Sequence, residues 1–291
     1  MRDGLIYAVI AYTLWGMMPL YLKQVETVSS VEIVAHRVIW SIVFGAILIA
    51  ARKQSGDVLR ALKTPKIVFV LFLAAIFISL NWLIYVWAVS EERVLEASLG
   101  YFINPLMYVA AGVLVLRETL NRSQIIAIAI ACIGVLILTV GLGKFPWVSV
   151  VLALLFTGYG YIRKTTDIRA MPGLFVETVL LAPIALIYLL FLWNSGTLTF
   201  ASGAHTIDFY LILAGPVTVM PLLLFSLSAR RLTMVIIGIT QYIGPTLQFC
   251  FGIYFGEKFT PYHGVAFGLI WIALAIFTWD AVKASKPKTI S

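Results

Sequence analysis

Long apolar runs dominate the chain and restrict its fold more than any other feature. Ten of them approach the roughly 20 residues with which an α-helix crosses the hydrocarbon core of a bilayer. Membrane β-strands alternate apolar and polar residues over about ten positions, which these runs do not do. Helices are therefore required, because lipid offers backbone groups no partners. The ten expected spans are Gly4–Tyr21, Val31–Ala51, Ile67–Val89, Val94–Leu116, Ser123–Val140, Trp147–Tyr161, Gly173–Trp193, Phe209–Ala229, Thr233–Phe255 and His263–Val282.

The composition agrees with an all-α polytopic membrane protein. Charged residues make up only 12% of the 291 residues, whereas a soluble domain carries about 25%. The net charge of +8 does not indicate nucleic acid, because the basic residues lie in short loops without a patch. Cys132 and Cys250 lie inside apolar runs, so we expect neither a disulfide nor a metal. No P-loop or other cofactor motif occurs, and no cofactor is expected.

The basic residues also predict an orientation. With ten spans, 16 of the Lys and Arg residues fall on the side of the N-terminus and four on the other side, while Arg37 lies within a span. Cytoplasmic loops carry the excess of positive charge. We therefore expect both termini in the cytoplasm.

An internal repeat divides the chain at an offset near 140 residues. Four matches occur in the same order: Tyr12–Gly16 with Phe156–Gly160, Tyr85 with Phe225, Phe102–Pro105 with Tyr242–Pro245, and Glu118–Asn121 with Glu257–Thr260. Each half holds five expected spans, so the second half must enter the membrane from the opposite side. We expect two inverted five-helix repeats, residues 1–142 and 143–291, the second with a short basic tail. Such repeats suit alternating access.

Three runs carry a resemblance to a known family. The runs Glu96–Pro105, Ala35–Ser41 and Gln241–Thr246 are similar to signatures of the RarD family, in the EamA branch of the drug/metabolite transporter (DMT) superfamily. The resemblance covers essentially the whole chain. It implies ten helices in two EamA-type repeats, a bacterial inner-membrane location and efflux-type transport. It also implies that the fifth and tenth helices are peripheral supports or subunit contacts, in a monomer or a homodimer.

Two proline-containing spans carry polar stripes. Tyr101, Asn104 and Pro105 share one helix face, and Gln241 and Pro245 repeat that spacing in the second half. We expect helix kinks at both prolines, since proline frees a carbonyl one turn earlier. Irregular helices near mid-bilayer often form transporter sites. The alternative is a kink with interhelical hydrogen bonds only.

Aromatic residues indicate a cavity wall, or alternatively the interfacial aromatic belts of membrane proteins. Tyr12 and Trp15 share a face of the first span, and Trp82 and Tyr85 share a face of the third, beside Asn81. Aromatic rings pack apolar solutes and hold cations on their π-faces. The complete set of expected substrate-binding residues is Tyr12, Trp15, Asn81, Trp82, Tyr85, Tyr101, Asn104, Gln241 and Tyr242.

Ionisable residues inside spans form a separate group of gating or coupling candidates. His36 and Arg37 lie near the outer end of the second span, and Glu96 enters the fourth span at similar depth. We expect an Arg37–Glu96 ion pair or a shared network. Glu177 lies near the cytoplasmic side, with Arg163, Lys164, Arg230 or Arg231 as its partner. Such groups are costly in lipid and are usually paired or functional. A gate, a static pair and proton coupling through His36, Glu96 or Glu177 remain alternatives.

These features favour a secondary active transporter, and not an enzyme. The expected solutes are small, organic and partly apolar, such as amino acids, metabolites or amphipathic drugs, and we expect export. Membrane lipid surrounds the protein, and protons are the candidate coupling ion. A membrane-embedded enzyme acting on a lipid or isoprenoid head group is one alternative. It would need its acid, base or metal ligands at one interface, whereas the candidates are split between two. A passive facilitator is another alternative, which sequence does not separate from a carrier.

Overall fold

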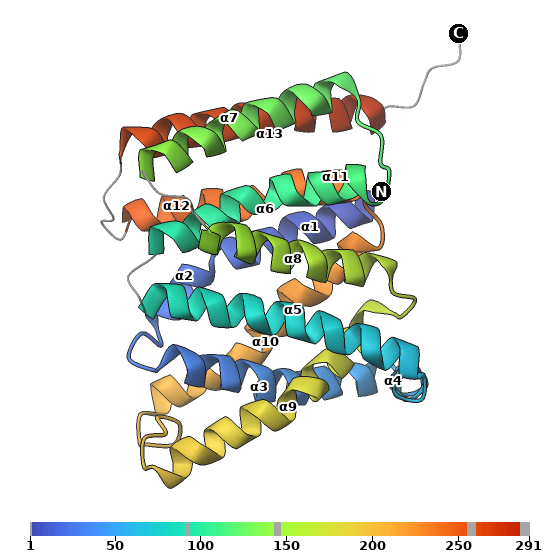
Figure 1. Ribbon diagram of the computed structural model, residues 1–291. Coiled ribbons are helices and arrows are strands. Elements are labelled where there is room, and N and C mark those ends of the chain that lie inside the picture. The colour runs from blue at the N-terminus through green and yellow to red at the C-terminus, as the bar shows by residue number, and fades with distance from the viewer. Residues whose placement is uncertain (1, 91–93, 143–146, 255–259, 286–291) are drawn as a thin grey trace.

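The computed structural model describes residues 2–90, 94–142, 147–254 and 260–285. Every regular element in this part of the chain is helical. The helices lie roughly alongside one another in a bundle (Figure 1). They are α1 (Arg2–Gly16), α2 (Met18–Lys23), α3 (Ser30–Ala51), α4 (Ser55–Leu62), α5 (Pro65–Ser90), α6 (Val94–Leu114), α7 (Arg122–Leu142), α8 (Trp147–Thr165), α9 (Ala170–Asn194), α10 (His205–Ala229), α11 (Met234–Thr240), α12 (Ile243–Tyr254) and α13 (Pro261–Ser285).

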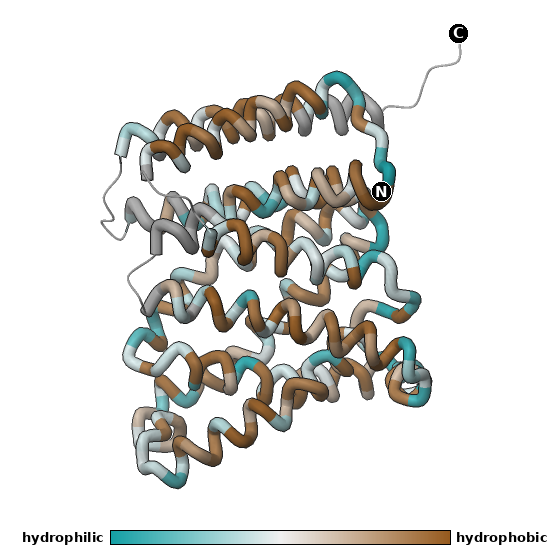
Figure 2. The backbone as a smooth tube through the Cα atoms, in the orientation of Figure 1, coloured by the Kyte–Doolittle hydropathy of each residue, from teal (hydrophilic) through white to brown (hydrophobic). Residues whose placement is uncertain are grey.

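Apolar side chains cover the outside of the bundle. Phe69, Ile184, Ile187 and Trp193 are each at least 66% exposed. Hydrophobic residues recur along most of the helices (Figure 2). A water-soluble protein rarely exposes a continuous apolar surface of this kind. Six described segments are long and apolar enough to cross a bilayer: Arg2–Lys23, Ser30–Ala51, Pro65–Tyr85, Arg122–Gly141, Ala170–Asn194 and His205–Ala229. The chain is a multi-pass membrane protein.

Four of the ten expected spans do not reach that length and hydropathy in the described residues. They correspond to α6, α8, the α11–α12 pair and α13. Described apolar stretches of Gly100–Leu114 and Gly264–Ile276 remain in α6 and α13. The other two have physical reasons for falling short, because α8 ends in Arg163 and Lys164 and the α11–α12 pair is interrupted.

Two expected spans are broken into shorter helices. The first is divided at Met17, after which α2 begins at Met18 with Pro19 in its first turn. The ninth is divided at Gln241 and Tyr242, where the amide of Tyr242 bonds to the carbonyl of Ile239 in a tighter turn. Proline has no amide hydrogen, so Pro245 donates no bond to the carbonyl of Gln241, which accepts from the amide of Gly244 instead. By contrast, α6 continues as a helix through Pro105.

The packing order places α7 and α13 together at one edge of the bundle (Figure 1). This contact and the other most extensive contacts cross between the first and second halves of the chain. Thus α6 packs on α8 and on α11, α1 packs on α10 and on the α11–α12 pair, and α3 packs on α9 and on α10. In the same way, α5 packs on α8 and on α9.

Candidate functional site

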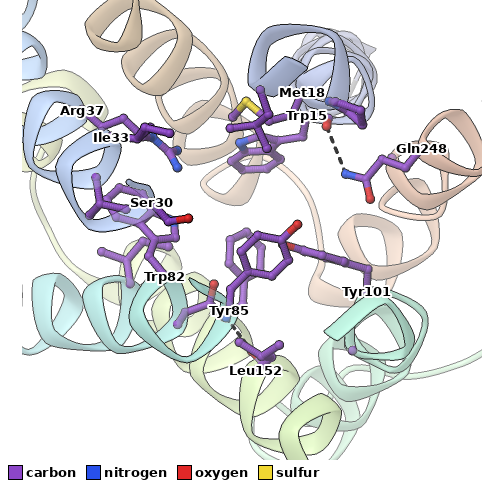
Figure 3. Close-up of a pocket in the computed structure, with 18 of the residues that line it drawn as sticks. Trp15, Met18, Ser30, Ile33, Arg37, Trp82, Tyr85, Tyr101, Leu152 and Gln248 are labelled. Carbon is purple, nitrogen blue, oxygen red and sulfur yellow. Dashed lines mark hydrogen bonds between the residues drawn. The ribbon is translucent and has the colours of Figure 1, made fainter. Parts of the chain in front are cut away.

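A central cavity of about 400 Å³ lies among the helices. Its wall is formed by α1, α2, α3, α5, α6, α8, α10 and the α11–α12 pair, and no described residue of α7 or α13 lines it. Figure 3 shows side chains from both halves of the chain pointing into this space. The cavity reaches the surface at the α2–α3 connection, because its wall includes Glu26, whose side chain is 59% exposed. We call this the open end.

Eight of the nine expected substrate-binding residues line the cavity. They are Tyr12, Trp15, Asn81, Trp82, Tyr85, Tyr101, Asn104 and Gln241. Pro245 also contributes to the wall, on the segment that follows the break between α11 and α12. The polar residues and the aromatic residues that the sequence singled out therefore line the same cavity.

Tyr242 is placed differently from the sequence expectation. It does not line the cavity, and its ring packs among Phe102, Ile103 and Phe267. Its hydroxyl donates to the carbonyl oxygen of Phe102 over 3.2 Å. The local turn at the break puts Gln241 and Tyr242 on opposite sides, so only Gln241 reaches the cavity.

Four amide side chains contribute polar groups to the cavity wall. Asn81 donates to the carbonyl of Leu152 over 2.9 Å, and Asn104 accepts from Thr157 over 3.2 Å. Gln248 donates to the carbonyl of Trp15 over 3.1 Å (Figure 3). These bonds fix the amides in place. The Oε1 atom of Gln241 is buried and has no hydrogen-bond partner among the described residues.

Arg37 places a positive charge in the cavity wall. Its Nε atom donates to Thr218 Oγ1 over 2.8 Å, and its guanidinium carbon lies 4.4 Å from the ring centroid of Trp82. The expected partner, Glu96, has a side chain that lies outside the described residues. The Arg37–Glu96 pair therefore stays a prediction.

Aromatic rings close the cavity opposite its open end. Phe225 lies at their centre, with ring centroids 5.5 Å from Phe156, 5.8 Å from Trp15, 6.0 Å from Tyr159 and 6.3 Å from Tyr108. We call these five rings the aromatic plug. The hydroxyl of Tyr108 donates to the carbonyl of Phe156, which joins α6 to α8 across the plug.

A buried ion pair lies beyond the aromatic plug. Arg163 Nη1 donates to Glu177 Oε1 over 2.7 Å, and both side chains are at most 2% exposed. Tyr159 donates to the other carboxylate oxygen over 3.3 Å, while Arg163 also donates to Ser226 Oγ and to the carbonyl of Ala170. Of the four cations expected for Glu177, the structure thus selects Arg163. The pair joins α8, α9 and α10.

The two charged sites lie near one another. A void of about 10 Å³ is lined by Arg37 on one side and by Glu177 and Tyr159 on the other. That volume approaches the size needed for one water molecule. Arg37 and Glu177 nevertheless form no ion pair with one another, because Arg37 donates to Thr218 and Glu177 pairs with Arg163.

Glu118 is a second acidic residue at the closed end of the bundle, the end that lies opposite the open end. It links two helices there. Glu118, in the α6–α7 connection, accepts from the amides of Met234 and Val235 over 2.9 and 3.1 Å. The first amides of a helix lack internal partners, and a carboxylate there also meets the positive end of the helix dipole. Glu118 therefore caps α11 from the other half of the chain. Lys164 donates to the carbonyls of Ala229 and Leu232 nearby.

His36 lies away from the cavity, in a cluster with Glu32. The carboxylate of Glu32 accepts from the amides of Thr199 and Phe200 and from the Thr199 hydroxyl. His36 Nε2 lies 3.8 Å from Glu32 Oε1, and its ring is 4.9 Å from that of Phe200. Glu32 therefore binds the start of α3 to the α9–α10 connection.

Sequence reasoning missed several residues of the site. Phe156 lines the cavity, and Glu32 and Glu118 hold the two ends of the bundle. A signal for Phe156 existed, because the internal repeat aligns it with Tyr12. Glu32 offered no such signal, since its partners come from a distant loop.

The fold and the cavity define a membrane protein whose helices enclose a space of solute size. Residues 2–140 match the EamA-like transporter family. Protein RarD of Streptomyces exfoliatus is 41% identical over 288 residues, which are 98% of this chain and 91% of that protein. An uncharacterized transporter of Pseudomonas aeruginosa is 43% identical over 282 residues, 97% of this chain and 95% of that protein. The chain therefore belongs to the EamA family of the drug/metabolite transporter superfamily and is similar to the RarD proteins.

Two further comparisons agree with this assignment. Chloramphenicol-sensitive protein RarD of Pseudomonas aeruginosa is 32% identical over 286 residues, 97% of this chain and 95% of that protein. One solved crystal structure of a protein with 17% sequence identity matches with a TM-score of 0.72 and covers 98% of this chain and 100% of that chain. At that identity the likeness concerns the fold alone. The resemblance read from the sequence is confirmed.

Proposed function

We propose that the protein is a secondary active transporter that exports small, partly apolar organic solutes by alternating access across the bacterial inner membrane. The observation that carries this proposal is the cavity, which reaches the surface at one end and is blocked at the other. A carrier that holds its solute between two gates must adopt such a one-sided state. The structure is then the state open on the side of the α2–α3 connection.

We propose ten spans in two inverted repeats, residues 1–142 and 143–291. We pair α1–α2, α3, α5, α6 and α7 with α8, α9, α10, α11–α12 and α13 in that order. This exchange converts each of the most extensive helix contacts into another of them or into itself. For example, the α6–α8 contact corresponds to that between the α11–α12 pair and α1, and the α3–α10 contact to that of α9 with α5. This exchange supports a two-fold relation between the halves. Inverted repeats of this kind let each half adopt the other's conformation.

The two ends of the bundle support the proposed orientation. In Figure 1, α4 and the α9–α10 connection lie at opposite ends. The end with α4 also holds the N-terminus and the α8–α9 connection, and the connections at this end hold most of the basic residues. Under the positive-inside rule this closed end faces the cytoplasm. The open end then faces the periplasm.

The gating roles follow from this orientation. Arg163, Glu177 and Glu118 form the cytoplasmic gate, with the aromatic plug between that gate and the solute. Proton coupling through Glu177, Glu96 or His36 remains the alternative role for these groups. Transport by Glu177→Gln and Glu96→Gln variants at two pH values tests it. Unchanged transport and unchanged pH dependence in both variants exclude coupling through either carboxylate.

Counterflow in liposomes tests the transporter proposal. Purified protein is reconstituted with a high internal concentration of an unlabelled solute, and uptake of the same labelled solute is followed. Solutes are chosen by thermal shift, since a ligand stabilises the folded protein by mass action. We expect saturable uptake that is accelerated by internal solute. A linear, unsaturable flux with no acceleration identifies a passive facilitator, and no flux for any stabilising ligand contradicts transport.

A further inference from the structure

Arg37 is unlike the other deeply placed arginine of the molecule. Arg163 pairs with the Glu177 carboxylate at 2.7 Å. The partners of Arg37 in the described part of the chain are both uncharged, namely the Thr218 hydroxyl and the Trp82 ring. A charge withdrawn from water is costly unless an opposite charge compensates it.

The described wall of the cavity supplies no such compensation. Its one acidic residue is Glu26, whose carboxylate pairs with Lys23 at 2.9 Å in an exposed position at the open end. Among the described lining residues, Arg37 alone is cationic. In the part of the wall that the structure describes, the interior of the cavity therefore carries one positive charge.

The guanidinium of Arg37 keeps donors for a ligand. Its Nε atom is used by Thr218, and its two terminal nitrogens have no hydrogen-bond partner in the described part of the chain. Arginine has five N–H donors in a planar fork that matches the two oxygens of a carboxylate. Thr218 and Trp82 hold this fork in place, and Figure 3 shows it at the side of the cavity opposite Gln248.

Aromatic rings occupy the space between those two sides. Trp15, Tyr85 and Tyr101 lie between Arg37 and Gln248 in Figure 3. The rings of Tyr85 and Tyr101 pack edge to face, with their centroids 5.8 Å apart. The unpartnered Oε1 atom of Gln241 adds a hydrogen-bond acceptor. Such a wall fits an apolar body with one anionic end and an N–H group.

We propose that the solute is a monoanionic carboxylate with an apolar body, and that Arg37 binds its carboxylate. This inference rests on the proposed transport function and assigns Arg37 to solute binding instead of gating. One cation in a cavity of about 400 Å³ matches a single carboxylate on a molecule of amino-acid size. Polyanionic solutes would leave charge uncompensated there.

Matched ligands test the carboxylate preference directly on the wild-type protein. The probes are benzoate, 3-phenylpropanoate and 4-methylpentanoate, each compared with its own amide, which has nearly the same shape without the charge. Binding is measured on purified protein by thermal shift and by tryptophan fluorescence, since Trp15 and Trp82 line the cavity. We expect at least one acid to bind about tenfold or more tightly than its amide, as for hydrogen bonds to charged groups. If no acid is preferred, the proposal is overturned.

Variants of Arg37 then test whether this residue causes the preference for an acid over its amide. Arg37→Gln is expected to reduce the acid-to-amide ratio to near one, while Arg37→Lys retains part of it. The matched control is Arg231→Gln, because the Arg231 guanidinium also lies over an aromatic ring, that of Tyr7 at 5.3 Å, but away from the cavity. An acid preference that survives in Arg37→Gln contradicts the assignment.

Counterflow separates failure of this inference from failure of the proposed function. If amides exchange as fast as acids in liposomes, the protein is still a carrier and the carboxylate assignment is wrong. Sodium chloride is included as a competitor at a constant ionic strength. Chloride that abolishes acid binding at millimolar concentration identifies an inorganic anion site and likewise overturns the proposal.

Discussion

Arg163 and Glu177 form an ion pair at 2.7 Å that is almost completely shielded from solvent. Removing one partner of such a pair leaves an uncompensated buried charge, whereas replacing both with apolar residues of similar size is often nearly neutral. The pair is therefore expected to be a strong local determinant of folding as well as of gating.

We predict that Arg163→Met alone lowers the free energy of unfolding by about 3–5 kcal/mol. The double variant Arg163→Met/Glu177→Leu is expected to recover most of that loss, as measured by thermal denaturation in detergent. The control is Arg169→Ala, which breaks the Arg169–Asp57 pair at 3.0 Å, where the arginine is 68% exposed. That change is expected to cost less than about 1 kcal/mol. A double variant no more stable than the single one contradicts the account.

Gly238 allows α11 to approach α6 closely. A Cβ atom at this position would lie 2.6 Å from the carbonyl oxygen of Pro105. We predict that Gly238→Ala lowers the melting temperature, with a cost of about 1–3 kcal/mol from overpacking. Gly268→Ala in α13 is the matched control, because no atom lies within 4 Å of its added Cβ. That control is expected to be neutral or slightly stabilising. Equal effects of the two changes speak against close packing at Gly238.

Gln241 and Tyr242 are neighbours with different expected roles. Gln241→Leu removes a buried oxygen that has no described partner, so its stability is expected to stay within about 1 kcal/mol of wild type. Its solute affinity is expected to change because the side chain lines the cavity. Tyr242→Phe is expected to lose about 1 kcal/mol from its bond to Phe102 without a change in affinity. Thermal denaturation and ligand titration of both variants test this; a reversed pattern refutes the placement.

The two ends of the bundle are expected to face opposite sides of the membrane. Single cysteines at Ser55 and at Thr197, in a background where Cys132 and Cys250 are replaced by serine, are tested with a membrane-impermeant maleimide. In intact cells we expect labelling at Thr197, in the α9–α10 connection, and none at Ser55 in α4. Labelling of both positions from one side would remove the basis for inverted repeats.

The general architecture could be read from the sequence because lipid imposes a simple rule on the chain. Apolar runs of bilayer length predicted the helical bundle, and the stripe of Tyr101 and Asn104 correctly predicted one wall of the cavity. The helix interruption at Gln241 was not predictable in position. Tyr242 was expected to bind solute, but it does not line the cavity and packs in a core cluster with Phe102 and Phe267.

Tertiary partners were the least predictable feature. Four cations near Glu177 were equivalent in the sequence, and only the packing of α8 against α9 selected Arg163. Glu118 bonds to α11, which lies 116 residues later in the chain. Spacing along one helix carries no information about such contacts, since they depend on how separate helices are arranged.

The aromatic plug and the Arg163–Glu177 pair resist movement in different ways. Ring contacts are weakly directional, so the plug yields gradually as a molecule presses against it. The hydrogen bond between the charged groups of Arg163 and Glu177 is 2.7 Å long and shielded from bulk solvent. Such a bond loses most of its energy when its atoms are displaced by a small distance. If these two layers form the proposed cytoplasmic gate, the rings can shift while the Arg163–Glu177 pair stays intact. Passage of a solute would then require that pair to break, so the pair would set the threshold for opening.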